Sequence, residues 1–95
     1  MRRLEITRRA LRSMRRIPKD RTRKILAALE ELRALEDPGS HHNVKAMKGD
    51  WVGFSRMRIG SYRAIFEVNP DLEAKQEDRL LLISVVAVGP RGDVY

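Results

Sequence analysis

Cysteine is absent from this chain of 95 residues, so neither a disulfide framework nor thiolate chemistry can be proposed for it. Long apolar runs are absent too. No run of about 18 apolar residues occurs, and no apolar run of signal-peptide length follows the basic N-terminus. We therefore expect a cytoplasmic protein without a membrane partner. The alternative for the arginine-rich start is an organelle transit peptide, which the regular pattern described below disfavours.

Histidine is scarce, and its placement argues against a metal centre. The two histidines, His41 and His42, are adjacent in a loop rich in Ser, Asn and Gly, without the i, i+4 spacing of helical metal ligands. We interpret both as solvated loop residues and expect neither metal nor cofactor.

Positive charge is abundant and unevenly distributed. The net charge is +7 and the sequence pI is about 10.6. Residues 1–24 alone carry eleven basic and two acidic side chains, and the remainder nets −2. Such a balance favours a polyanionic partner or an acidic protein. A chain this short has little room for an internal cavity, so any active site is expected at the surface.

Two amphipathic helices are predicted in the first half of the chain. Alternation at Leu4 and Ile6 indicates a short strand, and Thr7 can cap a helix that runs to about Ile17 and is ended by Pro18. A second helix, capped by Asp20, has an apolar stripe and closes at residues 37–39. The stripe comprises Ile25, Ala28, Leu29, Leu32 and Leu35.

The second half of the chain is predicted to form strands. Residues 51–66 form a hairpin around Gly60-Ser61, and residues 80–88 are long and apolar enough for a central strand buried on both faces. The polar stretch 69–78 is expected to be an exposed loop. The fold class is α+β: a short N-terminal strand and a helical hairpin packed on a small, mostly antiparallel, four-stranded sheet, as one domain over residues 1–95.

The hairpin register brings three arginines together. If Ile59 pairs with Tyr62, Arg58 lies directly opposite Arg63, and Arg56 shares the face of Arg58. Like charges directly opposite on paired strands are destabilising, so this arrangement favours a functional anion site over a merely solvated basic face.

The order of elements and three sequence stretches together resemble the RelE branch of the RelE/ParE toxin superfamily. The stretches are Val44-Lys45-Ala46-Met47-Lys48-Gly49, Arg56-Met57-Arg58-Ile59-Gly60-Ser61-Tyr62-Arg63 and Val88-Gly89-Pro90-Arg91-Gly92-Asp93-Val94-Tyr95. The resemblance covers nearly the whole chain. It implies a RelE-like fold and the toxin of a type II toxin–antitoxin system: a metal-independent endoribonuclease that cleaves mRNA in the ribosomal A site.

In that family the RNA 2′-hydroxyl attacks the adjacent phosphorus. Carried over by the resemblance, the catalytic residues are Arg56, Arg58, Arg63, Arg91 and Tyr95. Arginine stays charged, so Tyr95 is the only plausible base among them. Arg91 could supply a proton to the leaving oxygen, although electrostatic stabilisation is the safer role.

RNA contacts and partners complete the expectation. Lys45 and Lys48 are expected to contact the RNA backbone. The partners are a cognate antitoxin, the ribosome and its mRNA, and ribosomal RNA through the arginines of the first helix. Trp51 either stacks on a base or covers the apolar side of the hairpin with Met57 and Ile59, whereas Tyr62 is expected to pack in the core.

The sequence departs from the family pattern in three places, and the departures around Tyr95 keep a non-catalytic alternative open. Arginines replace the usual lysines at positions 56 and 58, Pro90 stiffens the approach to Arg91, and the sequence ends at Tyr95. The alternatives are a ParE-like toxin that poisons DNA gyrase and a non-catalytic ribosome- or RNA-binding module of the same fold.

Overall fold

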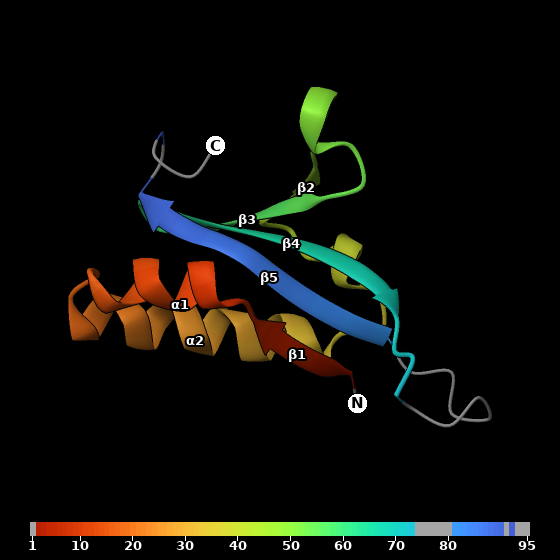
Figure 1. Cartoon of the computed structure of the whole chain (residues 1–95), viewed down its shortest axis with the longest axis horizontal. Helices are drawn as coiled ribbons and strands as arrows, with labels where there is room; N and C mark the ends of the chain where they lie inside the picture. Colours follow the sequence, from red (N-terminus) through yellow and green to blue (C-terminus); the bar gives the residue numbers. More distant parts are fainter. Residues whose placement is uncertain (1, 74–80, 91, 93–95) are drawn as a thin grey trace.

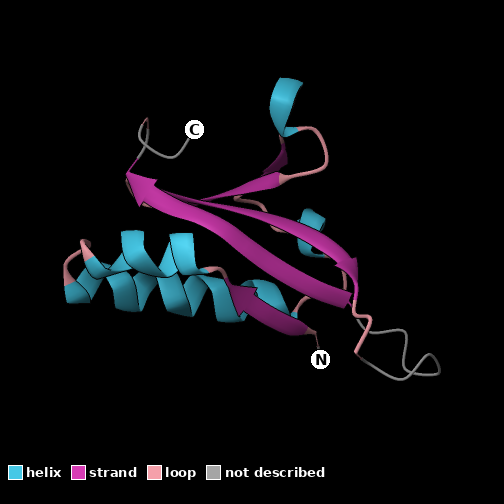
Figure 2. Ribbon diagram, in the orientation of Figure 1, coloured by secondary structure: helices cyan, strands magenta, loops and turns pink. Residues whose placement is uncertain are grey.

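Two helices lie on one face of a five-stranded sheet (Figures 1 and 2). The computed structural model describes residues 2–73, 81–90 and 92. The sheet has the order β1-β5-β4-β3-β2, in which β1 runs parallel to β5 and the other pairs are antiparallel. The elements, in chain order, are β1 (Arg3–Ile6), α1 (Arg8–Arg15), α2 (Lys19–Ala34), the 3-10 turn η1 (Pro38–Ser40), β2 (Val44–Ala46), the 3-10 turn η2 (Gly49–Trp51), β3 (Ser55–Ile59), β4 (Tyr62–Pro70) and β5 (Leu81–Pro90).

The α+β class is confirmed, but the expected strand count was one too low. The additional strand is β2, which pairs with β3 at the edge of the sheet. Only Val44 of its three residues is buried, so the sequence carries too little alternation to reveal it. This strand matters because it brings Lys45 opposite Arg56.

The helical hairpin is held by its caps and its turn. The Thr7 hydroxyl accepts a hydrogen bond from the Ala10 N–H at 3.3 Å, which confirms the expected cap of α1. α1 ends at Arg15, slightly earlier than expected. Asp20 does not cap α2: the cap position is Pro18, and Asp20 lies in the first turn, where a carboxylate favours the positive end of the helix dipole.

The core lies between the helices and the sheet. Ile25, Leu29 and Leu32 of α2 are fully or almost fully buried, which confirms most of the predicted stripe. They belong to one cluster with Met57, Ala64, Phe66, Ile83, Val85 and Val88 of the sheet. The helix-facing residues of the hairpin are therefore those expected.

β5 is an interior strand, as predicted, but only one of its faces is fully covered. A bulge lies where β4 pairs Ile65 with Ala87 and then Phe66 with Val85, leaving Val86 as the additional residue. Val85 belongs to the helix-side core, whereas Ala87 packs with Ile65 in a second, smaller cluster. That cluster lies on the face without helices, and half-buried Met47, Val86, Trp51 and Phe54 cover it.

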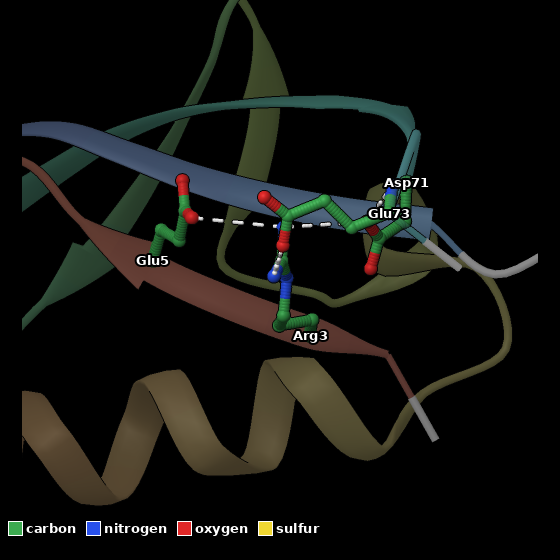
Figure 3. Close-up of polar contacts among 4 residues, drawn as sticks. All are labelled: Arg3, Glu5, Asp71 and Glu73. Atoms are coloured by element: carbon green, nitrogen blue, oxygen red, sulfur yellow. Dashed lines mark hydrogen bonds and ion pairs between the residues drawn. The ribbon is translucent and has the colours of Figure 1, made fainter.

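An ion-pair network ties β1 to the end of β4 (Figure 3). The Arg3 guanidinium hydrogen-bonds to Glu73, lies 3.2 Å from an Asp71 oxygen and 3.7 Å from a Glu5 oxygen. The bond to Glu73, with smaller contributions from the charges of Asp71, Glu73 and Glu5, raises the pKa of Arg3, against an opposing effect of desolvation. The network therefore keeps a cation at the outer edge of the sheet. Within the described residues, no helix is long and apolar enough to cross a membrane.

Candidate functional site

The β3–β4 hairpin has the predicted register. Gly60 adopts φ +61° at the turn, Ile59 pairs with Tyr62, and Arg58 lies directly opposite Arg63. Because side chains alternate along a strand, Arg56, Arg58 and Arg63 share the face that the helices leave uncovered. The three arginines are thus brought together as the sequence predicts.

These arginines line one cavity of about 330 Å³ on that face, which we call the cation pocket. Its lining residues are His42, Asn43, Lys45, Arg56, Arg58 and Arg63. Lys45 reaches it from β2, three arginines from the hairpin, and the remaining two from the loop before β2. None of the described residues of this lining is acidic, so this part of the pocket suits an anion.

Arg63 is the most informative residue of the pocket. Its side chain and backbone are together only 5% exposed, and Nη1 donates a hydrogen bond to the Tyr62 carbonyl oxygen at 3.2 Å. Among the described residues, no carboxylate lies within ion-pair distance of Arg63. A buried cation without a counter-ion is costly, and a bound anion would remove that cost.

The loop before β2 is anchored to the pocket, which the sequence did not predict. The Arg58 N–H donates to the Asn43 carbonyl oxygen at 2.9 Å. His41 is only 7% exposed, and its Nε2 lies 3.3 Å from a Glu31 oxygen. The interpretation of both histidines as solvated is therefore wrong for His41, whereas His42 is exposed at the pocket. A partner ten residues away on α2 leaves no signal in the local sequence.

A second hollow of about 430 Å³ adjoins the cation pocket and shares Lys45 and Arg56 with it. Lys48 and Trp51 also line this hollow. Trp51 packs edge-on against Phe54, with ring centroids 5.4 Å apart, on the face without helices. It therefore does not cover the apolar side with Met57 and Ile59, because η2 carries it to the arginine face. The second hollow extends the basic surface past Arg56.

The remaining predicted residues lie elsewhere. Arg91 and Tyr95 are outside the described residues. Tyr62 faces the helices and packs against the main core, as expected. Within the described ranges, His, Cys, Asp and Glu side chains form no group of three or more that could hold a metal ion. The described lining of the cation pocket consists of guanidinium, ammonium, imidazole and amide side chains.

Comparison with known proteins supports the resemblance seen in the sequence. A chain of the archaeal RelE–RelB complex from Pyrococcus horikoshii OT3 is similar over 97% of both chains, with 25% identity and a TM-score of 0.69. The YoeB/ParE toxin from Agrobacterium tumefaciens is 16% identical, with a TM-score of 0.70, over 93% of this chain and 97% of that toxin.

A third similar structure is the toxin–antitoxin complex RelBE2 from Mycobacterium tuberculosis. Its matched chain is 20% identical, with a TM-score of 0.58, over 95% of this chain and 98% of its own length. No curated protein matches the sequence. The fold is therefore RelE-like, as predicted.

One family model matches residues 4–95, and it describes the ParE toxin of the type II toxin–antitoxin system parDE. That range is nearly the whole chain and includes the cation pocket. The chain therefore belongs to this family of type II toxins, within the RelE/ParE superfamily.

Proposed function

We propose that this toxin is a ribosome-dependent endoribonuclease that cleaves mRNA in the A site. The observation that carries the proposal is the cation pocket, where Arg56, Arg58 and Arg63 line one cavity on the uncovered face of the sheet. Planar guanidiniums bind phosphate oxygens bidentately, so the pocket suits the scissile phosphate of an RNA strand.

The proposed reaction needs no metal. The RNA 2′-hydroxyl attacks the adjacent phosphorus, yielding a 2′,3′-cyclic phosphate and a free 5′-hydroxyl. Negative charge grows on the phosphoryl oxygens as the transition state forms, and the three guanidiniums stabilise it. Losing one such preorganised donor typically costs about 10² to 10³ in rate. The proposal assigns the base to Tyr95 and electrostatic stabilisation to Arg91, both by resemblance.

The second hollow offers a path for the rest of the strand. Lys45 and Lys48 line it together with Trp51, and Arg56 joins it to the cation pocket. We assign backbone phosphate contacts to the two lysines. The exposed arginines of α1 provide a further basic surface, to which we assign contact with ribosomal RNA.

The proposal includes a cognate antitoxin. Two of the similar solved structures are toxin–antitoxin complexes, one with RelB and one named RelBE2. A segment with acidic side chains would complement the cation pocket, whose described lining carries one lysine and three arginines. Occupying that pocket would keep RNA out and neutralise the toxin.

A second candidate function is poisoning of DNA gyrase. The observation that favours it is the matching family model, which is that of a ParE toxin. Against it stands the full set of catalytic counterparts in this sequence, since ParE-like members generally lack them. A gyrase poison acts through protein binding and has no need of the Arg58–Arg63 arrangement.

Primer extension on an mRNA translated by purified ribosomes tests the proposal, beside a gyrase cleavage assay. Wild-type toxin is expected to cut within A-site codons, and Arg58→Ala, Arg91→Ala and Tyr95→Phe are each expected to cut about 10²-fold less or worse. The matched control is Arg21→Ala, an exposed arginine of α2 that lies outside the pocket.

The possible outcomes separate the candidates. Gyrase-dependent DNA breaks without RNA cleavage would replace the nuclease by the second candidate. Ribosome binding without either activity would leave a non-catalytic binding module. Full cleavage by Arg58→Ala would refute the role of the cation pocket.

A further inference from the structure

We infer that His42 is the general acid of the proposed cleavage reaction, donating a proton to the departing 5′ oxygen. The inference rests on the proposed function and extends it to a residue that the family resemblance does not assign. The structural basis is the position of His42 in the lining of the cation pocket, where its ring stacks on that of His41. His41 is buried and hydrogen-bonded.

The pocket needs a proton donor that its arginines do not provide. The leaving 5′ alkoxide is a strong base, so cleavage is slow unless a proton reaches this oxygen as the bond breaks. Guanidiniums stay charged and act by binding rather than by proton transfer. Histidine is the residue type that gains and loses a proton near neutral pH, and His42 is the histidine of this lining.

The ring of His42 is supported as a functional side chain would be. It stacks on His41, with centroids 4.5 Å apart and an interplanar angle of 16°. His41 is itself fixed: its Nδ1 accepts a hydrogen bond from the Asn43 N–H at 3.1 Å. A backbone N–H can only donate, so we assign the ring proton of His41 to Nε2, which faces Glu31 at 3.3 Å.

This anchoring chain continues into the arginines. The Asn43 carbonyl oxygen accepts a hydrogen bond from the backbone N–H of Arg58. The loop that carries His42 is therefore joined to β3, which carries two of the pocket's arginines. An exposed imidazole is thereby held at the edge of the pocket by a buried neighbour. A merely solvated histidine would need no such support.

Among the described residues, the charged side chains that line the pocket with His42 are Lys45, Arg56, Arg58 and Arg63, and His41 stacks on the His42 ring. A phosphodiester held by these cations would therefore lie beside the imidazole of His42.

The step balances without a further reactant. The bond between the 2′ oxygen and phosphorus forms, and the bond between phosphorus and the 5′ oxygen breaks. Tyr95 takes the proton of the 2′-hydroxyl, and the His42 imidazolium gives its proton to the 5′ oxygen. Both residues then exchange protons with water.

A sulfur-substituted mRNA tests this assignment directly. Ribosomes are programmed with a short synthetic mRNA that carries either oxygen or a bridging 5′ sulfur at the scissile bond, and cleavage is followed in a single turnover. A thiolate leaves without a proton. His42→Ala is expected to cleave the oxygen mRNA about 10²-fold or more slowly than wild type, but the sulfur mRNA at a rate close to wild type.

Three further variants exclude other roles for His42. Tyr95→Phe is expected to stay slow on both mRNAs, because a base is still required. His42→Phe keeps a stacking ring, and His42→Arg keeps a cation that does not give up its proton, so wild-type cleavage of the oxygen mRNA by either variant would overturn the inference. So would equal slowing of His42→Ala on both mRNAs, or no slowing at all.

These outcomes are distinct from failure of the proposed function. If the wild type leaves both mRNAs intact, the nuclease proposal and the inference fall together. If the wild type cleaves them and His42→Ala does so equally well, the inference alone is refuted.

Discussion

Arg58 and Arg63 lie directly opposite each other on neighbouring strands, an arrangement that works against folding. Arg63 is almost fully buried, whereas Arg58 is exposed. The electrostatic repulsion between the two guanidiniums therefore acts between the interior of the pocket and its solvent-exposed edge. Both residues keep an arrangement that an anion would stabilise. The proposed binding of an anion would therefore recover stability that this arrangement costs.

The Arg58→Thr variant should separate these two effects. Removing the repulsion and placing a β-branched residue in β3 is expected to raise the free energy of unfolding by about 0.2–1 kcal/mol, as measured by urea denaturation. Raising the salt concentration should stabilise the wild type more than the variant, since salt screens the repulsion. RNA cleavage should fall about 10²-fold or more. A less stable Arg58→Thr protein would contradict the proposed strain.

At the scale of elements, the turn of the β3–β4 hairpin sets the position of every arginine in the pocket. Gly60 has φ +61°, and a Cβ built there would meet nothing within 4 Å. The cost of a side chain at this position therefore lies in the backbone conformation and not in crowding.

Replacing Gly60 tests the role of this turn. Gly60→Ala is expected to lower the free energy of unfolding by about 1 kcal/mol, and Gly60→Asn by less, because asparagine tolerates positive φ. Urea denaturation measures both variants. Equal losses for alanine and asparagine would show that something other than the left-handed conformation limits this position.

The elements that the sequence predicted are those with a repeating local pattern. The helix stripe around Ile25 and the hairpin register around Gly60 follow from periodicity and turn chemistry, and both were confirmed. β2 was missed because three residues are too few to alternate. The placements of Trp51 and His41 depend on residues distant in the chain, so local reasoning could not place them.

For the whole molecule, charge is as informative as shape. The net charge is +7, and the first quarter of the chain carries more positive charge than the molecule as a whole. The outer arginines of α1 are exposed on the helical side of the sheet, away from the cation pocket. The molecule thus presents basic groups on two sides, a distribution that suits a protein bound in a cleft between two RNA surfaces.

Neutralising α1 tests this distribution. Replacing Arg8, Arg9 and Arg12 by glutamine is expected to weaken ribosome binding and to make it less salt-dependent, with the slope of log K against log salt falling by about 0.7–0.9 for each lost phosphate contact. The matched control replaces Arg21, Arg23 and Lys24 of α2, which changes net charge equally. Equal effects of the two triple variants would mean that net charge, and not the α1 surface, drives binding.

The described residues that line the cation pocket run from His42 to Arg63, a stretch of chain that includes neither α1 nor α2. Both long helices and the parallel pair β1–β5 act as a scaffold for this segment. One consequence is modularity: transplanting this stretch between proteins of the same architecture, together with His41 and its α2 partner Glu31, should transfer substrate preference, while the rest of the host's helices remains unchanged.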